Sequence, residues 1–225
     1  MRSAPHSFLP RWLPALLVVA AAALLWIGYT GRWNRESWLA PEDYAGDPCE
    51  IYARVRLAMD DPLQPLLGFP HSARLAAPFG ADWSLYPVGD GPTFALAGLL
   101  GRWVGPVAAV NLLGCALIAA TALSFHLCAR RLRWRPEWAA VGALLFAFSN
   151  YHLRWFVTLS FTQTWTLPPL LLLCALASRP APALRGHRRL RPLAAGLGLW
   201  LGLGNPYFVF FAGCVIAGAM ALNRL

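Results

Sequence analysis

The segment 74–90, RLAAPFGADWSLYPVGD, places an arginine and two aspartates among turn-forming residues. Asp82 and Asp90 stand eight residues apart, and carboxylate oxygens are the ligands that hard divalent cations prefer. If the segment folds back on the chain, both side chains could join Asp47 around a divalent metal. The alternative is that both are turn aspartates, because the pair Asp90-Gly91 is typical of a turn.

Two arginines and two histidines are candidates for holding a phosphate group. The planar guanidinium matches the geometry of phosphate oxygens, which points to Arg74 and Arg154. His71 and His152 lie close to them in the sequence and are further candidates. The alternatives are that Arg154 extends from a helix end toward water at a membrane boundary, and that the histidines are ordinary surface residues.

The composition predicts a membrane protein. The chain has 225 residues, of which 58% are hydrophobic and 13% charged, whereas a soluble domain is about half apolar and about a quarter charged. A signal peptide is an alternative for the first apolar run, but that run ends without a small-x-small cleavage site. We expect an all-α membrane protein with about six transmembrane or half-spanning helices, at 12–29, 106–129, 138–150, 156–177, 193–204 and 207–222.

The placement of charge predicts the orientation. All 19 basic residues are arginines, and 12 of the 19 face the cytoplasm if the N-terminus is inside. We therefore expect a multi-pass protein of the inner (cytoplasmic) membrane with a cytoplasmic N-terminus. A nucleic-acid partner is not expected, because binding would need a basic face on a soluble module.

The long first loop, 30–105, is then extracytoplasmic, and it carries nine of the ten acidic residues. The segment 47–61 has Ile51, Val55, Ala58 and Met59 at helical spacing, with Glu50 and Arg54 on other faces, and so predicts an amphipathic helix on the membrane surface. The apolar segment 92–105 is too short to span and predicts an interfacial or re-entrant helix. The loop is thus expected to be structured.

The order of these features resembles the N-terminal part of bacterial polytopic glycosyltransferases of the GT-C type and their uncharacterised relatives with an APFG-type outer loop. The resemblance covers nearly the whole chain through loose motifs. These motifs are PEDYAGDPCEIY (41–52), RLAAPFGADWSLYPVGD (74–90), AVNLLGCALIAATALSFHLCARRL (109–132), LLFAFSNYHLRW (144–155) and LGNPYFVFFAG (203–213).

The resemblance implies transfer of a sugar from a polyprenyl-phosphate donor at the outer face of the inner membrane, with membrane lipid as the second partner. The essential acid of the first outer loop maps by position to Asp47, with Glu42 and Asp43 as rivals. Asp47 would accept a proton from the acceptor hydroxyl, and Arg74 or Arg154 would help to hold phosphate. Asp47 could instead be a helix N-cap.

Two features depart from the family pattern, and other functions stay open. Glu42-Asp43 reverses an acid pair of some members, and the chain reads WFVTLSFTQTW (155–165) where relatives tend to carry a histidine after the HLRW-like cluster. The chain is also short for the family, so we expect the N-terminal part of a longer protein, with an inactive fragment as one reading. The alternative function is a non-catalytic polytopic membrane protein, either a transporter or an envelope-assembly subunit. A transporter would be expected to show internal repeats, and none is found.

Overall fold

The computed structural model describes residues 12–42, 47–67, 71–72, 81–82, 89–155, 163–177 and 190–222. Within these ranges the secondary structure is helical, apart from one antiparallel pair of two-residue strands, β1 (His71–Ser72) and β2 (Ala81–Asp82). The predicted all-α class is therefore confirmed.

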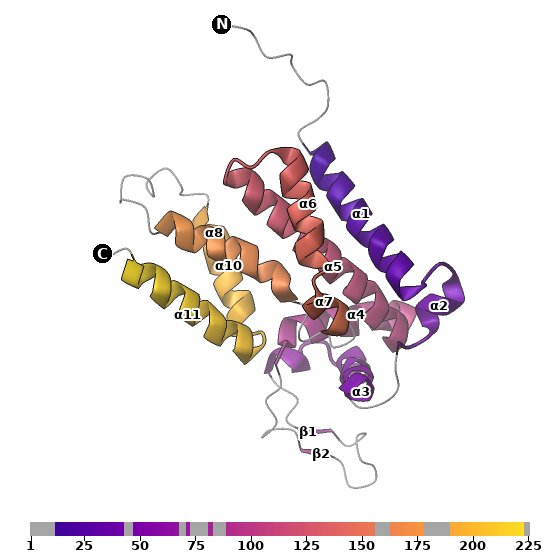
Figure 1. The fold of residues 1–225 in the computed structure, drawn as a ribbon. Helices are drawn as coiled ribbons and strands as arrows, with labels where there is room; N and C mark the ends of the chain where they lie inside the picture. The colour runs from indigo at the N-terminus through magenta and orange to yellow at the C-terminus, as the bar shows by residue number, and fades with distance from the viewer. Residues whose placement is uncertain are drawn as a thin grey trace, which may run out of the picture.

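The centre of the fold is a pair of long helices, α1 (Leu13–Thr30) and α5 (Pro106–Arg131), with α6 (Pro136–Ala147) packed against both (Figure 1). Small side chains line this interface, since Ala22, Ala122 and Ala143 are fully buried there. Small residues allow helix backbones to approach closely, as they do between helices in membranes.

A second group of helices stands beside α5. It comprises α8 (Leu167–Ala177), α10 (Leu190–Gly202) and α11 (Pro206–Leu222), which share one apolar cluster. The 3-10 helix η3 (Gln163–Thr166) precedes α8 and packs on α5. The predicted break between the segments 193–204 and 207–222 is confirmed, since α10 ends at Gly202 and α11 begins at Pro206. The Asn205 Oδ1 atom accepts a hydrogen bond from the Tyr207 N–H at 3.0 Å.

Among the described residues, two helices, α1 and α5, are long and apolar enough to cross a membrane. Length and composition alone support this statement, and buried core helices and N-terminal signal sequences share both properties. The helices at the other four predicted spans are shorter, with 12 residues in α6, 11 in α8, 13 in α10 and 17 in α11. Membrane association is thus suggested, whereas the six spans stay a prediction.

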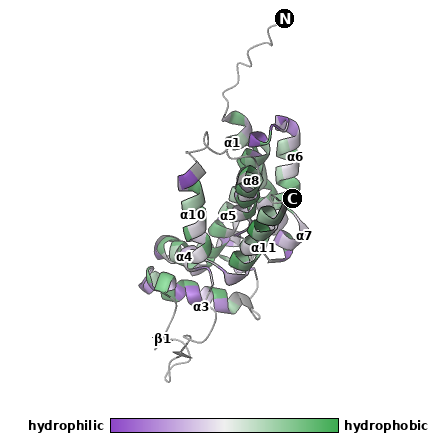
Figure 2. Ribbon diagram, turned by 90° about the vertical axis from the view of Figure 1, so that its left-hand side faces the viewer, coloured by the Kyte–Doolittle hydropathy of each residue, from purple (hydrophilic) through white to green (hydrophobic). Residues whose placement is uncertain are grey.

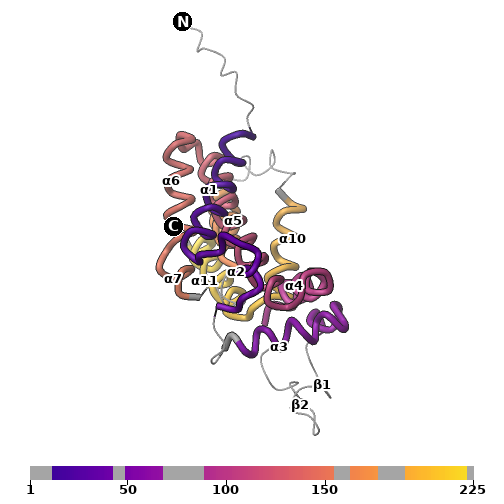
Figure 3. The backbone as a smooth tube through the Cα atoms, turned by 90° about the vertical axis from the view of Figure 1, so that its right-hand side faces the viewer, coloured from indigo at the N-terminus to yellow at the C-terminus, as the bar shows by residue number. Residues whose placement is uncertain are grey.

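The short helices of the first loop gather at one end of the long helices, opposite the turn between α5 and α6 (Figure 1). They are α2 (Arg35–Leu39), α3 (Asp47–Asp60), η1 (Gln64–Leu67) and α4 (Gly91–Val104). Figures 2 and 3 show α3 and α4 side by side across this end, which we call the cap; α7 (Asn150–Trp155) lies near it. The two helices predicted within the loop are confirmed as helices.

Glycines of α4 allow α3 to lie directly on it. A Cβ atom on Gly98 would lie 2.6 Å from the Ala58 Cβ and closer still to the Ala58 carbonyl. The Arg102 Nε and Nη2 atoms donate to the carbonyls of Met59 and Asp60 at 2.6 and 2.9 Å. These carbonyls belong to the last turn of α3, where backbone acceptors lack helical partners.

Arg54 differs from its predicted place on a polar face of the amphipathic helix. It is buried in the α3–α4 interface, where the guanidinium lies 5.5 Å from the centre of the Phe94 ring. Glu50, one turn earlier, forms an ion pair with Arg54. Because the partner helix α4 covers this face of α3, a position that the pattern assigns to solvent lies in the interior.

Arg32 fastens α2 to the end of α1. Its guanidinium donates to the carbonyls of Ser37 and Ala40 and pairs with Glu42 at 2.9 Å. The side chain is almost fully buried, and burial lowers the pKa of Arg32 while the Glu42 carboxylate opposes that change. Asn111 of α5 donates to the Ala40 carbonyl at 3.1 Å, so the start of the loop is held against the long helices.

A buried polar junction as the candidate functional site

Five polar side chains meet at the start of α4, and we call this cluster the polar junction. Asp90 is fully buried, and its backbone has a left-handed conformation, with φ of 72°. This conformation is uncommon outside glycine but is tolerated by aspartate and asparagine. The members of the junction are Asp90, Thr93, Gln163, Trp200 and Asn205.

Gln163 is the centre of the polar junction. Its amide nitrogen donates to the Asp90 carboxylate and, at 2.7 Å, to the Thr93 hydroxyl. Its amide oxygen accepts from the Trp200 indole N–H at 2.6 Å. Asp90 and Gln163 are 73 positions apart, so the contact joins the end of the first loop to η3.

Asn205 brings the α10–α11 break to the same carboxylate. Its Nδ2 atom donates to Asp90 Oδ2 at 3.3 Å across 115 positions of sequence. Gly89 allows this approach, because a Cβ atom there would lie 3.1 Å from the Asn205 Cα and 3.2 Å from the Pro206 Cδ. Asp90 is therefore a carboxylate held by two amide donors, and such charge-assisted bonds are stronger than neutral ones.

A second hydrogen-bonded chain runs beside the polar junction through His152. The Nδ1 atom lies 3.0 Å from the Phe146 carbonyl and 2.9 Å from the Ser149 hydroxyl. A carbonyl can only accept, so Nδ1 carries the proton and Nε2 accepts from the Thr164 hydroxyl. Thr164 in turn lies 3.3 Å from the Thr121 hydroxyl of α5. His152 thus connects α6, α7, η3 and α5.

Burial shifts the pKa values of two α7 residues, His152 and Tyr151, and the charge of Asp90 contributes to the shift of Tyr151. Burial lowers the pKa of His152, which agrees with a neutral ring donating from Nδ1. Burial also raises the pKa of the neighbouring Tyr151, and the negative charge of Asp90 raises it further. Tyr151 therefore lies within electrostatic range of Asp90 and stays in its neutral, hydrogen-bonding form.

The structure brings together two of the six site residues expected from the sequence. Asp90 and His152 both bond to η3, through neighbouring residues of that helix. Arg154 is exposed on α7, and the Asp47 backbone begins α3. Asp82 is the β-bridge partner of His71, also a candidate phosphate ligand. The side chains of Asp47, Asp82 and His71, and Arg74 as a whole, lie outside the described part of the chain.

The expected divalent-metal site finds no support from Asp90. Both of its carboxylate oxygens face amide N–H donors, which a cation would have to displace. Among the residues whose side chains are described, no group of three or more His, Cys, Asp or Glu residues gathers as metal ligands would. The described junction is built to hold a carboxylate with hydrogen bonds.

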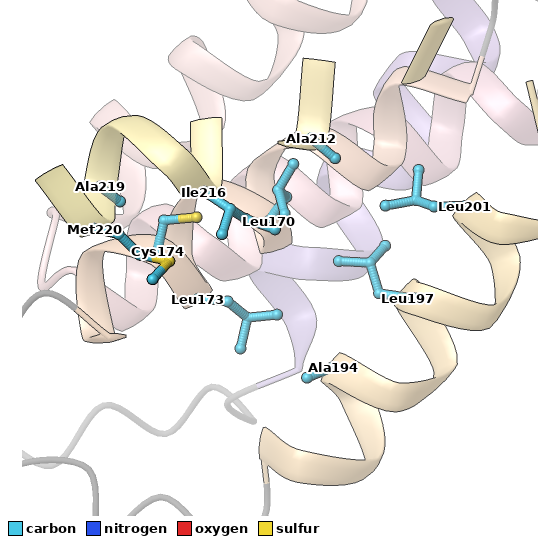
Figure 4. A pocket seen from close by; sticks show the side chains of 11 residues that line it. Leu170, Leu173, Cys174, Ala194, Leu197, Leu201, Ala212, Ile216, Ala219 and Met220 are labelled. Atoms are coloured by element: carbon cyan, nitrogen blue, oxygen red, sulfur yellow. The ribbon is translucent and has the colours of Figure 1, made fainter. Parts of the chain in front are cut away.

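An apolar cavity of about 300 Å³ opens between α8, α10 and α11 (Figure 4). Its wall is aliphatic apart from the Cys174 thiol and the Met220 thioether. Leu201 lines the cavity and is the neighbour in sequence of Trp200, so the cavity extends along α10 from a residue next to the polar junction.

Comparison with known proteins identifies no relative: no family model, curated protein or solved structure matches the chain.

Proposed function

We propose that the chain is a multi-pass protein of the bacterial inner membrane that transfers a sugar from a polyprenyl-phosphate donor, with the cap on the outer side. The observation that carries the proposal is the ordered cap, in which Asp47 begins α3, a helix that packs on α4 and on α5. A disordered first loop would have left no structure to position a carboxylate at the membrane boundary.

The exposure of α1 supports placement in a membrane. Only 17% of its 18-residue apolar window is buried, so it is not packed as the core helix of a soluble protein would be. Leu17 and Leu24 are 61% and 59% exposed. Such a surface needs a lipid or protein environment, because large contiguous apolar patches are rare on soluble monomers.

The two ends of the fold differ in the density of their arginines, which supports the orientation. The turn between α5 and α6 carries four exposed arginines within six positions, at 130, 131, 133 and 135. At the capped end, Arg32 and Arg54 are buried and pair with carboxylates. The exposed Arg35, Arg56 and Arg102 are spread over three separate helices of the cap. A cluster of arginines in a short loop is the signal that keeps the loop in the cytoplasm, so we place the capped end outside.

The chemistry assigned to Asp47 is general-base catalysis. The acceptor hydroxyl attacks the anomeric carbon of the donor sugar while the bond from that carbon to the phosphate oxygen breaks. The hydroxyl proton passes to the Asp47 carboxylate, and polyprenyl phosphate leaves with the bonding electrons. Arg154, exposed on α7 near the cap, would bind the leaving phosphate, and the apolar cavity would hold part of the isoprenoid chain.

The test measures release of polyprenyl phosphate by the full chain in proteoliposomes supplied with undecaprenyl-phospho-glucose and undecaprenyl-phospho-mannose, with a heat-inactivated bacterial envelope extract present to supply acceptor hydroxyls. Asp47→Asn should reduce release about 10²- to 10⁴-fold, the usual contribution of a general base. Glu36→Gln, which alters an exposed acid of the same cap, is the matched control and should leave release unchanged. Full release by Asp47→Asn would remove Asp47 from the mechanism.

Orientation is tested separately with the exposed Cys49 of α3. A membrane-impermeant maleimide added outside intact spheroplasts should label the chain, and Cys49→Ser should abolish that label. Protection of Cys49 until the membrane is permeabilised would reverse the proposed orientation.

One observation favours the alternative of a non-catalytic envelope-assembly subunit. The described side chains of the polar junction bond to one another, as they would in a purely structural contact. This alternative predicts no release of polyprenyl phosphate by the unaltered chain with either donor, together with normal insertion into the membrane.

A further inference from the structure

We propose that the turn between α5 and α6 and the groove beside it form a binding site for one anionic phospholipid of the cytoplasmic leaflet. The inference rests on the membrane placement proposed above and does not depend on sugar transfer. The site lies at the end of the fold opposite the cap, and none of its residues belongs to the polar junction.

The turn presents a concentrated positive charge. Its four arginines occupy six consecutive positions and are all exposed. The nearest acid in the sequence, Glu137, lies 3.6 Å from Arg135, and both side chains are more than two-thirds exposed, so water screens this pair. The arginines are Arg130, Arg131, Arg133 and Arg135, and with Glu137 the formal charge of the turn is +3.

The backbone of the turn is well defined, which fixes where these charges lie. The Trp134 N–H donates to the Ala129 carbonyl at 3.0 Å, closing α5 with a Schellman-type bond. Arg133 takes the left-handed position of this motif, with φ of 68°, where glycine is the usual residue. Because position 133 holds an arginine and not the usual glycine, the turn carries one additional positive charge.

An apolar groove of about 420 Å³ continues from these charges along α6. It is lined by Trp134, Arg135, Trp138, Val141, Gly142 and Leu145. Within α6 the groove runs from Trp138 to Leu145, which is seven residue steps or roughly 10 Å of helix, about the length of the upper half of an acyl chain.

Two tryptophans shape the mouth of the groove. The Trp134 ring is fixed by an edge contact with Phe125, with ring centres 6.2 Å apart, and lies over Gly142. Trp138 is 64% exposed. Tryptophan is enriched at the level of lipid headgroups because its ring is apolar while its N–H can bond to water or phosphate.

The combination of features selects a phospholipid with negative charge. Inorganic phosphate would use the arginines but leave the groove empty, and a zwitterionic lipid would fill the groove while gaining little from the arginines. Basic pockets at the cytoplasmic ends of transmembrane helices bind anionic headgroups in this way. The acyl chain of phosphatidylglycerol would lie along Val141 and Leu145, with its phosphate among Arg133 and Arg135.

The test is native mass spectrometry of the purified full chain in detergent, titrated with phosphatidylglycerol or with phosphatidylcholine of identical acyl chains. The unaltered chain should retain one phosphatidylglycerol at least tenfold more tightly than phosphatidylcholine. Arg133→Gln/Arg135→Gln should remove most of this preference. Arg35→Gln/Arg56→Gln changes two exposed arginines at the capped end and should preserve it.

A second variant separates the groove from the charges. Val141→Trp fills the groove at a position 48% exposed and should weaken binding of both lipids while the arginines remain. Equal binding of the two lipids, or equal loss in both arginine pairs, would overturn the proposal, and circular dichroism establishes that each variant is folded. No sugar donor is present, so either outcome leaves the transfer proposal to its own test.

Discussion

Replacing Asp90 by asparagine isolates the hydrogen bonding of the polar junction from its backbone geometry. Asparagine tolerates the left-handed conformation as well as aspartate does, so the φ of 72° costs no more in the variant. The new side chain can still accept from Gln163 through its oxygen. Its amide nitrogen would then face the Nδ2 donor of Asn205, 3.3 Å from the present oxygen, and that bond is lost.

The loss comprises one charge-assisted hydrogen bond and leaves a buried donor of Asn205 without this acceptor, which is worth about 2 kcal/mol. For a chain of this size, that change lowers the melting temperature by roughly 4–8 °C. Differential scanning fluorimetry of the full chain in one fixed detergent measures it.

Exchanging the two side chains tests whether Asp90 and Asn205 interact directly. Asn205→Asp alone places a second carboxylate against Asp90 and should destabilise the chain more than Asp90→Asn does. The double variant Asp90→Asn/Asn205→Asp restores a carboxylate facing an amide, and the carboxylate introduced in place of Asn205 could still accept from the Tyr207 N–H. Its melting temperature should exceed that of either single variant. A double variant whose loss equals the sum of the two would show that the residues do not interact.

Two further predictions concern the packing of the cap and the His152 chain. Gly98→Ala should destabilise the chain by about 2–3 kcal/mol, because the new Cβ meets the Ala58 backbone; Gly213→Ala, where no atom lies within 4 Å, is the control, and equal melting temperatures would contradict the packing. Burial lowers the pKa of His152, so as pH falls below about 6.5 the unfolded chain binds this proton before the folded chain and stability decreases by at most about 1.4 kcal/mol per pH unit. His152→Gln should therefore lose less stability than the unaltered chain between pH 7 and 5 in thermal melts, and parallel losses would exclude His152 as a source.

Sequence patterns located the helices because these depend on local features. Apolar runs of sufficient length predicted α1 and α5 to within two residues at each end, and Asn205-Pro206 predicted the break between α10 and α11. The segments 47–61 and 92–105 likewise proved helical. The burial of Arg54 could not be predicted, because it depends on Phe94 from a helix about forty residues away.

In the polar junction, too, local sequence patterns predicted some features, whereas others depend on contacts between distant residues. Gln163 and Thr164 stand out in the sequence as polar residues in an apolar segment, where such side chains bond to neighbouring helices, and both do so in the structure. Trp200 and Asn205 gave no signal that they share a cluster with Gln163. The sequence pattern predicts either a turn residue or a metal ligand at Asp90, and the structure shows a left-handed residue that is also a buried hydrogen-bond acceptor.

The sequence by itself determined that the chain forms apolar helices, that four arginines cluster between positions 130 and 135 and that the first loop carries nine of the ten acids. These properties follow from composition and from periodicities of a few residues. The tertiary structure alone decided which polar groups meet. Asp90 forms hydrogen bonds with partners 73 and 115 positions away. No local sequence pattern specifies such contacts, because they exist only where packed helices bring separate chain segments together.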